Sequence, residues 1–145
     1  MKIKLNNNVN PELKEFLLSQ EGITEVDINY DNLYVDLNIK YNNKTNSNII
    51  MKYIELFEDY KYSNIVEFDK DYKDKTKTLK YTIDDMCCDY CYMGFVMNLF
   101  ENDNIKSCKS NYNNDRPAYN IEFKIEYSDN YDEQELLKYI KEIYK

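Results

Sequence analysis

An internal repeat is the feature that most constrains how this chain can fold. The stretch VDLNIKY at 35–41 matches IEFKIEY at 121–127, and IMKYI at 50–54 matches LLKYI at 136–140 with the same offset. One offset shared by two separate stretches indicates two copies of a single structural unit, rather than a similarity of composition. A fold for the first half must therefore also suit the second half.

The two copies share one predicted order of strands and helices. In the first copy, alternating apolar residues predict strands at 2–5, 23–30, 33–41 and 64–68, and helical spacing predicts helices at 10–22 and 49–57. In the second copy, strands are predicted at 78–83, 104–112 and 118–127, with one helix after the cysteines and one at 133–143. We therefore predict the α+β class, with two tandem ferredoxin-like βαββαβ units whose helices cover one face of an antiparallel sheet.

The division into units has a consequence for the sheet edge. We place one unit at 1–72 and the other at 73–145, and we expect them to pack together or to dimerise, because units of this size are marginally stable alone. The second unit lacks a fourth strand, which in this fold would lie beside its first strand. The backbone of strand 78–83 is therefore expected to form an exposed edge, through which a homodimer could assemble.

Charge and composition exclude several classes of function. The net charge of −8 disfavours nucleic acid as a partner, and the absence of histidine excludes an imidazole base or imidazole metal ligands. No apolar run approaches the length of a membrane span, and the N-terminus does not resemble a signal peptide. We expect a cytoplasmic protein that is neither membrane-embedded nor an enzyme. In that compartment, clustered thiols are more often metal-binding or catalytic than structural disulfides.

Three of the four cysteines lie in the stretch MCCDYC, residues 86–91. Cys91 is expected in the first turn of a helix, where exposed N–H groups and the helix dipole favour a thiolate, and Cys88 on the preceding loop can reach the same point. Soft thiolates select Cu(I), Zn(II) or Cd(II) over Mg(II) or Ca(II). The same Cys-x-x-Cys pattern also serves thiol–disulfide exchange, so the residues alone leave both interpretations open.

With this motif, the second copy resembles the heavy-metal-associated domain, the βαββαβ module of copper chaperones and of the N-termini of metal-pumping P-type ATPases. The family motif Met-x-Cys-x-x-Cys corresponds to Met86, Cys88 and Cys91, and two apolar helix positions of the family correspond to Phe95 and Leu99. The resemblance implies that Cys88 and Cys91 bind Cu(I) and that Met86 shapes the loop. It implies as partner a metal-transporting P-type ATPase or another thiol metal carrier.

The second copy also departs from the family pattern. Cys87 stands where copper-handling members usually have threonine or another small residue. It is either a third sulfur ligand, which would suit Cd(II), Pb(II), Hg(II) or trigonal Cu(I), or a bystander facing solvent. Zn(II) would need a fourth ligand, such as Asp85, Asp89 or a water. Asp85 replaces a usual glycine, and Lys145 lies where the family often has a Lys, Tyr or Phe near the metal.

The first copy carries no cysteine. At a constant offset, Lys4, Asn6 and Val9 take the places of Met86, Cys88 and Cys91, so we expect this copy to be a scaffold or docking unit. The fourth cysteine, Cys108, aligns with Val26 and is expected to be a small buried hydrophobic residue.

The leading interpretation is soft heavy-metal binding, by a chaperone, a buffer or a transport-associated domain. The first alternative is a thiol–disulfide redox protein, although the only proline of the second half, Pro117, lies in a predicted turn rather than opposite the cysteines. The second alternative is an interaction module whose metal site is degenerate.

Overall fold

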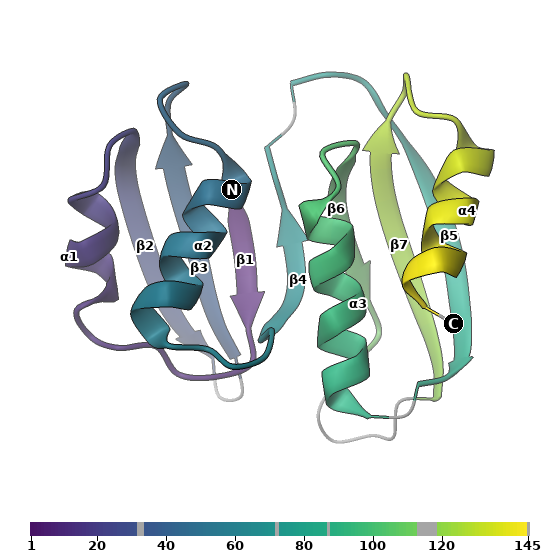
Figure 1. Ribbon diagram of the computed structural model, residues 1–145, viewed down its shortest axis with the longest axis horizontal. Helices are drawn as coiled ribbons and strands as arrows, with labels where there is room; N and C mark the ends of the chain where they lie inside the picture. Colours follow the sequence, from purple (N-terminus) through teal and green to yellow (C-terminus); the bar gives the residue numbers. More distant parts are fainter. Residues whose placement is uncertain (32–33, 72, 87, 113–118, 145) are drawn as a thin grey trace.

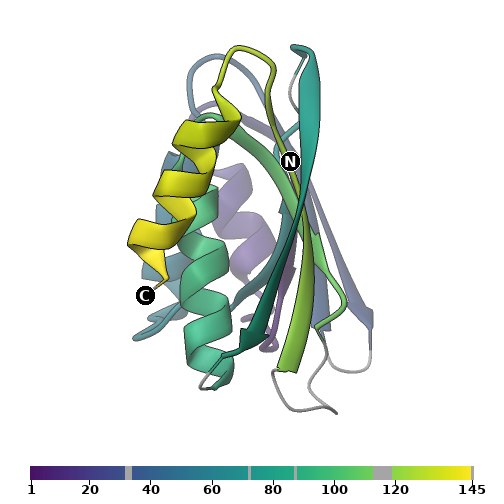
Figure 2. The same ribbon diagram turned by 90° about the vertical axis from the view of Figure 1, so that its right-hand side faces the viewer.

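The computed structural model describes residues 1–31, 34–71, 73–86, 88–112 and 119–144. Within these residues the chain forms one seven-stranded antiparallel sheet in the order β2-β3-β1-β4-β6-β7-β5 (Figure 1). All four helices of the described chain lie on one face of this sheet, and the other face is open (Figure 2). The arrangement confirms the α+β class and is consistent with two ferredoxin-like units.

The N-terminal half is built around a central strand. Its elements are β1 (Lys2–Leu5), α1 (Leu13–Leu18), β2 (Ile23–Asp31), β3 (Tyr34–Tyr41), α2 (Ser47–Glu58) and β4 (Ile65–Asp69). Strand β1 pairs with β3 on one side and with β4 on the other. Because side chains alternate along a strand, Ile3 and Leu5 are buried beneath the helices, whereas Lys2 and Lys4 lie on the open face.

The C-terminal half has three strands among the described residues. Its elements are β5 (Thr76–Asp85), α3 (Asp89–Glu101), β6 (Ile105–Ser110), β7 (Tyr119–Ser128) and α4 (Glu133–Ile143). Strand β7 is central here, between β5 and β6. Within the described chain β5 pairs with β7 alone, so the open edge expected for strand 78–83 is present. No described helix has the length and apolar character needed to cross a membrane.

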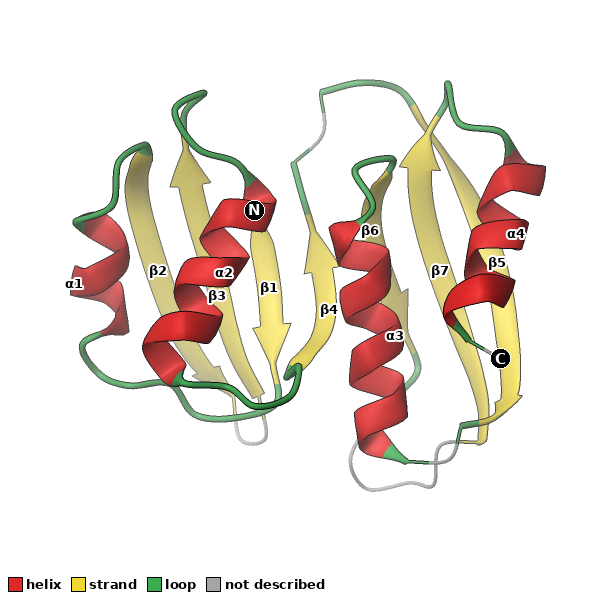
Figure 3. Ribbon diagram, viewed as in Figure 1, coloured by secondary structure: helices red, strands yellow, loops and turns green. Residues whose placement is uncertain are grey.

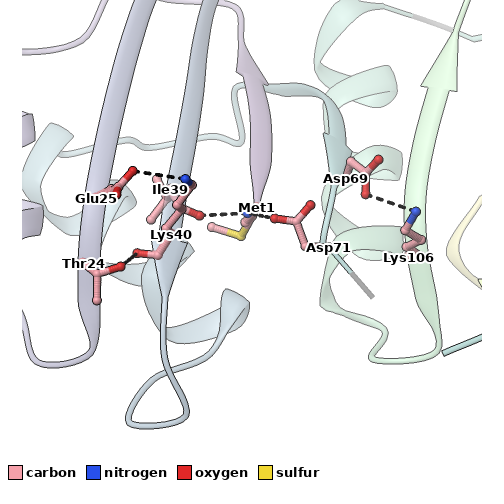
Figure 4. A network of polar contacts seen from close by, with 8 residues as sticks. All are labelled: Met1, Thr24, Glu25, Ile39, Lys40, Asp69, Asp71 and Lys106. Atoms are coloured by element: carbon pink, nitrogen blue, oxygen red, sulfur yellow. Dashed lines mark hydrogen bonds and ion pairs between the residues drawn. The ribbon is translucent and has the colours of Figure 1, made fainter. Parts of the chain in front are cut away.

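The two halves join through β4 and β6. Phe68 lies opposite Cys108 and Asp69 opposite Ser107 in this antiparallel pairing. Lys106 Nζ forms an ion pair with Asp69 Oδ1 at 3.7 Å across the junction (Figure 4). Beside it, the Met1 nitrogen donates to the Ile39 carbonyl at 2.8 Å and forms an ion pair with Asp71, as Figure 4 also shows. The two halves therefore pack together in one continuous sheet, which was one of two expectations, the other being dimerisation. Residue 72, the proposed boundary between the units, lies outside the described residues.

The repeated stretches occupy equivalent places in the two halves (Figure 3). Asn46 caps α2 by accepting a hydrogen bond from the Ile49 N–H at 3.0 Å, and its counterpart Asp132 caps α4 by accepting one from the Gln134 N–H at 2.8 Å. Two matched apolar pairs of these helices are fully buried: Ile50 with Leu136, and Ile54 with Ile140. Both helices therefore begin at an equivalent capping residue and bury equivalent side chains.

Candidate metal centre

The cysteine loop connects the end of β5 to the start of α3. Cys88 has extended backbone angles, φ −170° and ψ 175°, and is the N-cap residue of α3 without making a side-chain capping bond. Cys91 lies in the first turn, which closes when the Tyr92 N–H donates to the Cys88 carbonyl at 3.2 Å. Cys88 is exposed and Cys91 is half-buried. Met86 is 3% exposed, so its thioether packs in the core beneath the loop.

The Sγ atoms of Cys88 and Cys91 lie 3.7 Å apart. A disulfide needs about 2.05 Å, so these two sulfurs are not bonded to each other. A zinc–sulfur bond of about 2.3 Å with tetrahedral angles would set two sulfur ligands about 3.8 Å apart, whereas linear coordination at that bond length would need about 4.6 Å. The observed separation therefore suits one ion held in bent geometry, and a rotation of the exposed Cys88 side chain would open it toward linear geometry.

Cys91 is disulfide-bonded in the structure, and the separation just given shows that Cys88 is not its partner. Cys87, the proposed third sulfur ligand, and Lys145 both lie outside the described residues. Within the residues that are described, no three His, Cys, Asp or Glu side chains converge closely enough to hold a metal ion. Because Cys91 is disulfide-bonded, it could bind a metal ion only after reduction to the thiol.

Aromatic side chains hold the start of α3 in place. Tyr92, which follows Cys91, is fully buried; its hydroxyl lies 2.6 Å from Ser110 Oγ and donates to the Val66 carbonyl at 2.9 Å. Its ring stacks on Tyr112 with centroids 3.9 Å apart. The roles of Tyr92 and Tyr112 have no signal in the sequence, because Tyr92 contacts β4 and β6 and Tyr112 contacts α3, and these partners are remote in the chain.

Tyr112 also fixes the first residue of α3. Its hydroxyl donates a hydrogen bond to Asp89 Oδ1. Burial, followed by this hydrogen bond and the charge of Asp89, raises the pKa of Tyr112 well above its ordinary value, so the hydroxyl remains a donor at neutral pH. A carboxylate in the first helical turn also complements the helix dipole. Asp89 thus links the first turn of α3 to Tyr112.

The N-terminal half forms one wall beside Cys88. The Tyr62 ring, before β4, lies against the Tyr90 ring of α3 with centroids 5.2 Å apart, and each side chain is about two-thirds exposed. A hollow of about 440 Å³ adjoins this pair, lined from the N-terminal half by Asn6, Asn7, Asp59, Tyr60, Lys61, Tyr62 and Asn64, and from α3 by Cys88, Asp89, Tyr90 and Met93. The cysteine loop is therefore approached through a surface that both halves build.

Strand register corrects the alignment of the first copy. Leu5 pairs with Val35, and Ile83 pairs with Ile121. Since positions 35 and 121 correspond in the repeat, Leu5 is the counterpart of Ile83, and Lys4 within β1 is the counterpart of Thr82 within β5. The predicted equivalence of Lys4 with Met86 was wrong, because Lys4 lies within β1 whereas Met86 follows the end of β5. Asn6 and Val9 lie between β1 and α1, where the strand register does not reach, so their equivalence with Cys88 and Cys91 stays a prediction.

The remaining cysteine is structural, as expected. Cys108 is fully buried on β6 opposite Phe68. Burial raises the pKa of its thiol well above the ordinary value, which keeps the sulfur protonated. A buried, protonated thiol behaves as a small hydrophobic side chain, so Cys108 provides an internal control for experiments on the loop.

Comparison with known proteins gives little to add to this geometry. No family model matches the chain, and no curated protein matches it. Among solved structures, the N-terminal soluble domains of Bacillus subtilis CopA, determined in solution, align with 15% sequence identity and a TM-score of 0.39, covering 99% of this chain and 89% of that chain.

Proposed function

We propose that this protein binds a soft heavy-metal ion through Cys88 and Cys91 and passes it to another thiol carrier without catalysing a covalent reaction. The 3.7 Å separation of the two sulfurs across the first turn of α3 is the observation that supports this most directly. Once Cys91 is reduced, two thiolates placed this close together can share one ion, and the N-terminal end of α3 favours negative charge. We place this site in a unit at 73–145 and treat 1–72 as a ligand-free unit.

Cu(I) is the metal we propose first, because the Met86–Cys91 motif resembles that of copper-binding members of the heavy-metal-associated family. The bent geometry that suits the sulfur separation also favours Zn(II) or Cd(II), provided that further ligands complete the coordination. Cys87 is the proposed source of a third sulfur. The choice of metal therefore depends on whether Cys87 takes part.

Transfer would proceed by ligand exchange. Cys88 is exposed and stands at the loop side of the site, whereas Cys91 is half-buried in the helix. A thiolate of the partner can therefore displace Cys88 first, while Cys91 still holds the ion, and the metal passes through a shared three-coordinate state. We propose as partner a metal-transporting P-type ATPase or another thiol metal carrier, in a compartment reducing enough to keep the cysteines as thiols.

Cadmium titration of the reduced chain tests the ligand set, because thiolate-to-metal absorption in the ultraviolet reports each sulfur bound. Cys88→Ser and Cys91→Ser should each remove a large share of the signal and weaken binding at least about tenfold, while Cys108→Ser should leave both unchanged. Cys87→Ser then decides whether the third thiol is a ligand. Full binding in the Cys88→Ser and Cys91→Ser variants would refute the proposed site.

A second function is favoured by one observation, the disulfide-bonded state of Cys91. A cysteine pair at a helix start that cycles between thiol and disulfide would make the protein a redox carrier. Equilibration of metal-free protein in glutathione buffers of graded potential tests this function. A reversible two-electron transition at a reduction potential between that of the cytosol and more oxidising values would support this function. Thiols that stay reduced at every potential would exclude it.

A further inference from the structure

β5 is the longer of the two edge strands of the described sheet. β5 runs for ten residues, from Thr76 to Asp85, and among the described residues it pairs with one strand only, β7, while the Asp85 carbonyl accepts a further hydrogen bond from the Tyr144 hydroxyl at 2.8 Å. Figure 2 looks onto this edge, and no helix crosses in front of it. Its outward N–H and C=O groups can therefore pair with another strand.

We propose that this strand is β5 of a second copy of the chain, paired antiparallel about a two-fold axis at Tyr81. Residues directly opposite in such a pair lie on the same face, so the helices of both copies stay on one side and the two sheets continue as one. A second copy is the proposed partner because the side chains of two β5 strands complement one another in this register.

The helix-covered face provides the first part of that complementarity. With Tyr81 opposite its own counterpart, Leu79 of each copy lies opposite Ile83 of the other, so three apolar pairs form in a row. Leu79 and Tyr81 are only half-buried in a single copy, at the rim of the core. Directly opposed apolar and aromatic residues stabilise antiparallel pairs by about 0.2–1 kcal/mol each.

Charge provides the second part. In the same register Lys77 of each copy lies opposite Asp85 of the other, and both side chains are exposed; within one copy Lys77 also forms an ion pair with Asp129 Oδ1 at 3.7 Å, which is itself half-exposed. The neighbouring registers are less favourable. An axis at Lys80 would oppose two like charges. An axis at Thr82 would pair Lys80 with Asp84 but would set Leu79 against Asp85, which leaves two apolar pairs in place of three. Like charges directly opposite one another destabilise a pair, so the sequence of β5 selects the axis at Tyr81.

Charge exchange on the full chain tests both the partner and the register. Sedimentation of metal-free protein under reducing conditions should show a dimer that dissociates on dilution. Lys77→Glu and Asp85→Lys should each weaken the dimer about tenfold or more, and the double variant should recover it, because the opposed pair is then restored with its signs reversed. Lys80→Glu is the matched control, since its opposite residue is Thr82, and it should have a much smaller effect.

Three outcomes would overturn the proposal: a monomer at all concentrations, a dimer indifferent to both single substitutions, or a double variant that remains dissociated. Because the measurement uses metal-free protein, its result does not depend on the metal-binding function. A dimer that survives in the Cys88→Ser variant would show this independence directly.

Discussion

The hydroxyl of Tyr92 on α3 donates a hydrogen bond of 2.9 Å to the carbonyl of Val66 on β4. This bond crosses from one half of the chain to the other and starts from the residue that follows Cys91. The position of the cysteine loop is therefore determined by both halves, although all its cysteines come from one. A cysteine-free first copy can thus act on the site through structure, without contributing a ligand.

Removing this bond should destabilise the protein and loosen the loop. In Tyr92→Phe the Val66 carbonyl loses a buried donor, which should cost about 1–3 kcal/mol of unfolding free energy in urea denaturation. Tyr139→Phe is the matched control, because Tyr139 donates to the Asn98 carbonyl at 2.5 Å within the C-terminal half. Only Tyr92→Phe should also change the alkylation rate of Cys88; equal rates in both variants would contradict the coupling.

The contact between Tyr62 and Tyr90 should limit access to Cys88. Tyr62→Ala removes a ring that lies against α3 beside the hollow, so iodoacetamide should alkylate Cys88 several-fold faster in the reduced, metal-free protein. Tyr30→Ala provides the control, since Tyr30 is also in the N-terminal half and 61% exposed on β2, but is not among the residues that line the hollow. Unchanged alkylation in Tyr62→Ala would show that the N-terminal half does not cover the thiol.

Lys70 should make stability depend on pH. Its side chain is 3% exposed, donates to the Asn102 carbonyl at 3.0 Å and lies 4.9 Å from the centre of the Phe100 ring. Burial lowers the pKa of Lys70 from 10.5 to about 8, partly opposed by the charge of Asp103.

Between pH 8 and 10.5 the unfolded chain therefore holds the proton that the folded protein releases, and unfolding free energy rises with pH in this window. The full rise would be on the order of 3 kcal/mol. Below pH 8 both states are protonated, and Lys70 adds no slope. Urea denaturation between pH 8 and 9.5 measures the effect. Lys70→Met should flatten the curve, and an equal slope in that variant would rule out Lys70 as its source.

Most of the fold was predictable because it depends on local pattern. The helix at 133–143 was predicted with its observed ends, since Asp132 is a strong cap and the apolar spacing after it is regular. The first helix was predicted at 10–22 but spans only Leu13–Leu18. Helix boundaries depend on tertiary contacts at the ends, and those contacts are not encoded by spacing alone.

The surroundings of the site were not predictable in the same way. The motif identified Cys88 and Cys91, and the structure brings their sulfurs together. Their support, however, comes from Tyr92, Tyr112 and Tyr62, three of sixteen tyrosines in the chain. Each acts through a partner distant in sequence, and the pairing of β4 with β6 that joins the halves leaves no periodic signal.

Copper competition tests the central claim most directly. The fully reduced chain would be titrated into a chromophoric Cu(I) chelator under anaerobic conditions, and the metal removed from the chelator would be counted per chain. We predict one Cu(I) per chain, lost in Cys88→Ser/Cys91→Ser and retained in Cys108→Ser. Failure of the wild-type chain to take Cu(I) from the chelator, or equal uptake by the double variant, would contradict it.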